Sequence, residues 1–137
     1  MIVRTGFLFF VFASLVSIGM ASENKEEAAK QAALTWLELV DSGQYRASWD
    51  KAATPFKMQV SSDQWEKAVQ SARRPLGALV SRRFASSHYT TTLPGAPDGE
   101  YVVLQFETKF ENKASATETV TPMLDDGAWR VSGYYIR

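Results

Sequence analysis

The apolar residues of this chain change their spacing once, between Pro75 and Gly77, and that change constrains the fold more than any other feature. Before it, apolar residues recur every three or four positions, which is typical of amphipathic helices. After it, they alternate with polar residues, which is typical of half-buried strands. Helices followed by consecutive strands predict an α+β domain in which helices cover one face of an antiparallel sheet.

Three helices are predicted ahead of this change. The first covers residues 25–41, where small and large apolar residues form one stripe. A short second helix begins near Gln44 and ends at Pro55, because proline lacks the backbone donor that a helix needs. The third begins with the capping-box pattern of Ser61 and Gln64.

Four strands are predicted after the change. At ~3.3 Å per residue the first strand would span roughly 45–50 Å, so a bend or bulge is expected in it. Pro122 predicts an edge or bulge at the end of the third strand. The loop over residues 93–99, with its two prolines and two glycines, is interpreted as the hinge of a hairpin. The strands cover residues 78–92, 100–111, 114–124 and 128–137.

Residues 1–21 have the pattern of a cleaved secretory signal peptide. One cation, Arg4, precedes an uncharged apolar run that closes on small residues, so Ser22 is the expected mature N-terminus. That run is about 17 residues long, at the lower limit for crossing a bilayer, and an uncleaved N-terminal anchor stays open as the alternative. Both alternatives place residues 22–137, a single α+β domain, outside the cytoplasm, in the periplasm or secreted.

The composition excludes several classes of function. The chain has no cysteine, which excludes disulfides, thiolate nucleophiles and cysteine metal sites. Once Arg4 is removed, acidic residues exceed basic residues by one. This balance gives no electrostatic reason to expect nucleic acid as a partner, or a membrane after signal cleavage.

Three stretches together resemble a family of exported bacterial proteins, the domain-of-unknown-function 4019 family. They read "WLELVDSGQYRASWDKAA", "RRPLGALVSRRF" and "LPGAPDGEYVVLQFETKFENKASATETVTPMLDDGAWRVSGYYIR". The resemblance covers nearly all of residues 28–137. The family has no established activity, as its name says, so the resemblance assigns no catalytic residue.

A looser resemblance links the chain to the nuclear transport factor 2-like superfamily. It rests on a first helix ending in "DSGQY", a short helix with "SW", and a final strand opening "DDGAWRVSGYY". The resemblance implies a cone-like fold, nuclear transport factor 2-like or cystatin-like, in which a curved four-stranded sheet wraps around helices. Such folds often hold an apolar cavity, and some are enzymes that place an acid, a histidine or a tyrosine inside it.

Few residues qualify for such chemistry. His88, the sole histidine, and Glu107 are weak catalytic candidates. A general base needs a positioned partner, and the sequence indicates no partner for either residue. One histidine without cysteines is a poor basis for a zinc site. A carboxylate site for a hard cation stays open, although Asp125, Asp126, Asp98 and Glu100 lie in predicted turns, where acidic residues are usual. Neither a metal nor a cofactor is therefore expected. Neighbouring strand residues point to opposite faces, so Arg82 and Arg83 are expected as one half-buried and one solvated arginine rather than an anion clamp.

The aromatic residues give the remaining signal. They are interpreted either as a core, which a domain without disulfides needs, or as the wall of a cavity for an apolar ligand. Gln105 and Glu107 could supply polar contacts to such a ligand. The candidate ligand-binding residues are Trp36, Trp49, Phe84, Gln105, Phe106 and Trp129.

Two hypotheses of function follow. The first is a non-catalytic binding or interaction module that takes a small apolar ligand or a protein partner, with a homodimer through the sheet as a further expectation. The alternative is a small hydrolase or isomerase acting on an apolar ligand in the cone.

Overall fold

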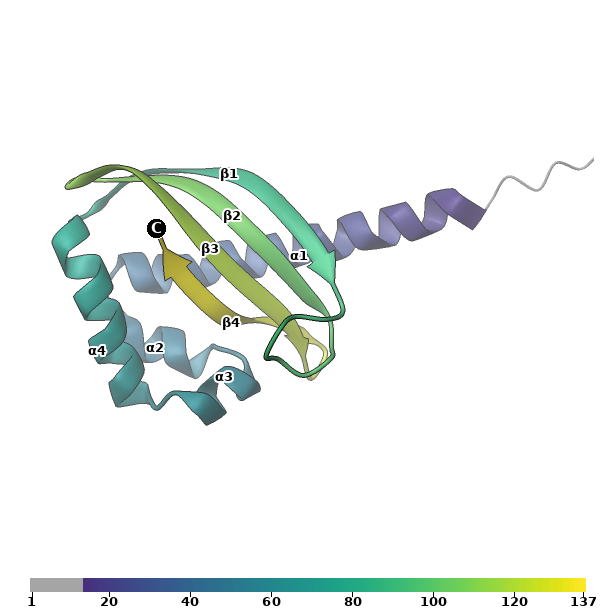
Figure 1. Cartoon of the computed structure of the whole chain (residues 1–137), viewed down its shortest axis with the longest axis horizontal. Coiled ribbons are helices and arrows are strands. Elements are labelled where there is room, and N and C mark those ends of the chain that lie inside the picture. The colour runs from purple at the N-terminus through teal and green to yellow at the C-terminus, as the bar shows by residue number, and fades with distance from the viewer. Residues whose placement is uncertain (1–13) are drawn as a thin grey trace, which may run out of the picture.

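A computed structural model describes residues 14–137, and side-chain environments are given from Ala21 onward. Its helices are α1 (Ser14–Asp41), α2 (Tyr45–Asp50), α3 (Thr54–Gln59) and α4 (Ser62–Arg73), followed by a 3₁₀ turn, η1 (Arg74–Leu76). The strands are β1 (Leu79–Thr90), β2 (Tyr101–Phe110), β3 (Lys113–Asp125) and β4 (Ala128–Ile136). Figure 1 shows a curved sheet with α1 running along it, and α2, α3 and α4 gathered at one end.

The sheet has the order β1-β2-β3-β4, and every neighbouring pair is antiparallel. This confirms the α+β arrangement of helices and an antiparallel four-stranded sheet. The cone that the looser resemblance implies stays a prediction. β1 has the expected irregularities, since its pairing with β2 shifts register after Leu79 and again after Phe84. The β3–β4 pairing shifts at Pro122, where a bulge was expected.

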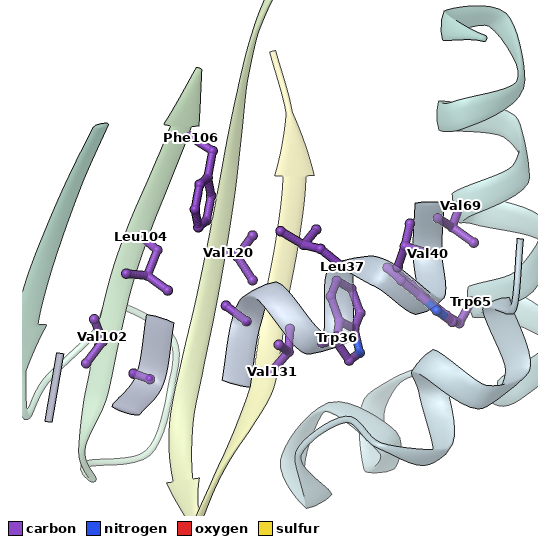
Figure 2. Close-up of a cluster of buried hydrophobic side chains, with 12 residues drawn as sticks. Trp36, Leu37, Val40, Trp65, Val69, Val102, Leu104, Phe106, Val120 and Val131 are labelled. Atoms are coloured by element: carbon purple, nitrogen blue, oxygen red, sulfur yellow. The ribbon is translucent and has the colours of Figure 1, made fainter. Parts of the chain in front are cut away.

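The core lies between α1 and the sheet. The predicted stripe of α1 is buried, with Ala29, Ala33 and Leu37 fully covered. It packs on the inward face of β2, where alternate residues from Val102 to Phe110 are buried. Figure 2 shows the cluster continuing past Val40 to Trp65 and Val69 of α4.

Two helix boundaries differ from the predictions. α1 is longer than predicted, since it is already helical at Ser14, the first described residue, and no proline or glycine interrupts it between Met20 and Asp41. Pro55 follows a break after Asp50 but also lies in the first turn of α3, where its missing N–H costs nothing. The third predicted helix is confirmed as α4, and its capping box of Ser61 and Gln64 is formed in both directions.

The loop between β1 and β2 joins the two strands and also packs against the sheet. Tyr101 is 2% exposed, and its hydroxyl donates to the carbonyl of Pro97 at 2.6 Å. Leu93 and Ala96 pack against Tyr101 and Met123, so the loop folds back over the sheet and forms a second, small core.

Candidate functional site

A groove separates α4 from the end of β4, and we call it the α4–β4 groove. Its volume is about 440 Å³, within the size range of small-molecule sites. Figure 1 shows the end of β4, marked C, facing α4. The lining residues are Trp65, Ala68, Val69, Ala72, Leu76, Lys113, Tyr134, Tyr135, Ile136 and Arg137.

The groove follows from two local features of the sequence. β4 ends at Ile136, opposite Glu118, so the first residues of β3 extend past its end. On the facing wall, α4 presents Ala68 and Ala72, which are exposed and too small to reach the strand. α4 packs mainly on α2, which holds it beside the sheet edge.

The two ends of the groove differ chemically. At one end the Trp65 and Tyr134 rings both contact Trp36, with centroid distances of 5.8 and 5.4 Å. At the other end Leu76 accepts a backbone hydrogen bond from Asn112, which precedes Lys113. Lys113 and Arg137 are the charged residues in the lining, and among the described residues no aspartate or glutamate joins them.

A buried network of charged residues lies behind the groove, and we call it the Glu118 cluster. Glu118 is fully buried on β3. It accepts hydrogen bonds from Arg82 Nε at 2.7 Å, Arg82 Nη2 at 3.2 Å and Thr108 Oγ1 at 2.5 Å, and also from the Tyr134 hydroxyl. These four donors occupy both carboxylate oxygens, so Glu118 has little capacity left to act as a base.

The network continues from Arg82 to the ends of two helices. Arg82 donates through Nη1 and Nη2 to Asp41 at 2.8 and 3.0 Å, and Arg73 Nη2 donates to the same carboxylate at 3.0 Å. The Arg73 guanidinium also lies 4.8 Å from the centre of the Phe110 ring. The cluster thus takes one residue from each of α1, α4 and the four strands, and its two arginines balance two carboxylates.

The pKa values of Arg82 and Tyr134 are both raised, which disfavours release of a proton from either group. Burial alone would lower the pKa of Arg82, but its hydrogen bonds and attraction to Asp41 and Glu118 raise that pKa above its ordinary value. Burial, followed by the charge of Glu118, raises the pKa of Tyr134 far above that of free tyrosine. The arginine therefore stays charged and the phenol stays protonated at ordinary pH.

The two weak catalytic candidates lie on the other face of the sheet. Glu107 is exposed and pairs with Arg83 of β1, and His88 is exposed and pairs with Val103 of β2. Because Val102, Leu104 and Phe106 point inward, residues paired with the intervening positions point outward. Gln105 also points outward, where it accepts a hydrogen bond from Ser86 at 3.4 Å.

The aromatic candidates fall into separate places. Phe106 is buried in the core with Phe84 against its edge, 6.0 Å between ring centroids. Trp49 is half-buried and donates its indole N–H to the Val60 carbonyl at 2.7 Å. Trp36 and Trp129 both line a different hollow of about 600 Å³ between α1 and the start of β4.

Side chains of both charges distinguish the lining of that hollow from the α4–β4 groove. Glu38, Lys51 and Arg130 line the hollow, so charges of both signs interrupt its apolar surface. Burying such groups against a ligand is costly unless each of them finds a partner.

The sheet residues expected to pair with a second copy are Tyr89, Thr91, Tyr101, Thr119 and Tyr135, and the structure covers several of them. Tyr101 and Thr119 are 2% and 4% exposed, and Tyr89 lies inward, with its hydroxyl donating to Glu100 at 2.8 Å. Tyr135 is 48% exposed and stays available. The homodimer through the sheet stays a prediction, resting on fewer residues.

Of the members of the Glu118 cluster, only Arg82 was singled out by the sequence patterns. Arg82 is half-buried, with its side chain 10% exposed, and Arg83 is exposed, as the alternation predicted. The sequence did indicate that Glu118 is buried, because it lies two positions from both Ala116 and Val120, on the same buried face of β3.

No three acidic or histidine side chains come together as metal ligands anywhere in the part of the chain that the structure describes. Among those same residues, 14–137, no helix is both long and apolar enough to cross a membrane.

A known protein family matches most of this chain. The model of the family described as "Protein of unknown function (DUF4019)" matches residues 32–134. The chain belongs to this family. The DUF4019 match runs from within α1 to Tyr134 of β4, so it includes every member of the Glu118 cluster and most of the groove. No curated protein matches the chain at a significant level.

Proposed function

We propose that the chain is an exported, non-catalytic binding module that holds a small apolar ligand in the α4–β4 groove. The observation that carries this proposal is the lining, in which aromatic and aliphatic side chains of α4 and β4 face each other without an acidic residue among those described. Sites of this kind bind mainly by burying apolar surface, at roughly 25 cal/mol per Å².

The same lining argues against the alternative of a hydrolase or isomerase. The titratable side chains of the groove are Lys113, Arg137 and the phenols of Tyr134 and Tyr135. Tyr134 is hydrogen-bonded to Glu118, and its raised pKa disfavours proton release. The weak candidates Glu107 and His88 face away from the groove side of the sheet. An acid–base reaction needs a group poised near the working pH, and the pKa of Tyr134 is raised away from it.

Binding in the groove can be tested by filling it. The exposed Ala72 lies on the groove wall, and Ser71 beside it is exposed and outside the lining. We expect Ala72→Trp to weaken binding of the neutral apolar fluorophore N-phenyl-1-naphthylamine at least tenfold, and Ser71→Trp to leave it unchanged. Fluorescence titration measures both, with melting temperatures to show that each variant is folded. Equal affinity in the two variants would place the fluorophore elsewhere and refute the proposed site.

Export is the second element of the proposal. Its predicted signal, residues 1–21, lies mostly outside the described residues. Among the residues whose side chains the structure describes, the buried stripe of α1 starts at Ala29, after the expected cleavage point before Ser22. We expect the chain expressed in a Gram-negative host to appear in the periplasmic fraction with Ser22 as its first residue, as measured by intact mass. A membrane-bound product that retains residues 1–21 would instead favour the N-terminal anchor.

A further inference from the structure

The α4–β4 groove is elongated. Its helical wall runs from Trp65 to Leu76, which at 1.5 Å per residue is roughly 16 Å. The opposite wall follows β4 from Tyr134 to Arg137 and then passes to Lys113 on β3, because β4 stops short of the β3 start. A narrow, extended ligand suits this shape better than a compact one.

Charge is unevenly distributed along the groove. The end beside Trp65 and Tyr134 is aromatic, and the Tyr134 hydroxyl is turned toward Glu118. At the opposite end Lys113 is half-buried and forms no ion pair with any described carboxylate. The Arg137 guanidinium lies 5.3 Å from the centre of the Tyr135 ring.

From this polarity we infer that the ligand is a single-chain amphiphile with a carboxylate head, such as a medium-chain fatty acid. The carboxylate lies at Lys113 and the chain extends along Ala72 and Val69 toward Trp65. The inference rests on the proposed function and adds the chemistry of the head group. A lysine ammonium and a carboxylate form a charge-assisted hydrogen bond, and the apolar walls exclude water from the chain behind it.

The alanines of α4 fit this assignment. Ala68 and Ala72 give the helical wall small side chains, along which an unbranched chain can lie. The groove has no acidic side chain among the described residues, so a cationic amphiphile would place its charge against Lys113 without compensation.

The experiment measures displacement of N-phenyl-1-naphthylamine by dodecanoate, by dodecan-1-ol and by dodecylammonium, each below its aggregation concentration. We expect dodecanoate to bind roughly tenfold more tightly than the alcohol, a difference of about 1.4 kcal/mol, and dodecylammonium to bind most weakly. Lys113→Glu should abolish the preference for dodecanoate and favour dodecylammonium. Lys109→Glu is the matched control, since Lys109 is exposed near the same hairpin but lies outside the groove lining, and it should retain the wild-type order.

The outcomes separate this inference from the proposed function. Equal binding of dodecanoate and dodecan-1-ol, unaffected by Lys113→Glu, overturns the head-group assignment and leaves an apolar binding module. If the fluorophore binds but none of the three displaces it, the single-chain ligand is wrong. If neither the fluorophore nor any amphiphile binds, the proposed function fails as well. Sedimentation with phosphatidylglycerol vesicles, without displacement by monomeric dodecanoate, would assign the surface to membranes and also overturn the inference.

Discussion

Exchanging Glu118 for leucine is expected to lower the free energy of unfolding by about 3–5 kcal/mol, the usual cost of removing one partner from a buried ion pair. The change leaves Arg82 Nε and the hydroxyls of Thr108 and Tyr134 without their acceptor, in a place that water does not reach. Equilibrium unfolding in urea measures the loss as a shift of the midpoint.

Two further variants show whether charge is the cause. Glu107→Leu, at an exposed position on the neighbouring strand, should change stability by less than about 0.5 kcal/mol. The double change Arg82→Met with Glu118→Leu should recover part of the loss, because it removes the unpaired cation while Asp41 keeps its bond to Arg73. A Glu118→Leu protein as stable as the parent would contradict the view that the cluster is a fixed structural element.

Truncating Trp36 to alanine is expected to cost about 3–5 kcal/mol, as is usual for a large aromatic residue in a core. Its side chain is 4% exposed, lies against the rings of Trp65 and Tyr134, and donates to the Ser48 carbonyl at 2.8 Å. Ser48 also accepts from the Trp65 indole, so one buried serine positions both tryptophans. Thermal and urea unfolding measure the effect.

Trp129→Ala is the matched comparison for this prediction. Trp129 is only half-buried, at the wall of the hollow between α1 and β4, so its truncation should cost clearly less than that of Trp36. Equal losses would mean that the exposed part of Trp129 is covered in solution, by a second copy or by another partner.

The elements of the fold could be read from the sequence because their signals are local. The capping box at Ser61, the alternation of β2 and the turn at residues 125–127 each depend on residues a few positions apart. In that turn Asp126 and Gly127 both adopt positive φ, 51° and 77°, as a tight hairpin requires. The start of α3 was missed because Pro55 can end one helix or begin another, and only the contacts of the folded chain decide which.

The candidate site could not be predicted in the same way. The Glu118 cluster joins residues from six elements, and Asp41 meets Arg82 across 41 positions of the chain. The groove exists because β4 is shorter than β3 and because α4 rests on α2, which are consequences of packing rather than of any motif. His88 and Glu107 are residue types typical of catalysis, but they lie on the exposed face. The buried charge of Glu118 instead lies on a strand face whose other residues are apolar.

The two bulges of β1 also bear on how the protein behaves at high concentration. β1 is an edge of the sheet, and an open edge can pair with a strand of another molecule. The register shifts after Leu79 and Phe84 interrupt the regular row of donors and acceptors that such pairing needs. At the opposite edge, the Ala53 N–H already donates to the Val131 carbonyl of β4 at 2.8 Å. Both edges thus resist addition of a foreign strand, and growth into fibrils is disfavoured.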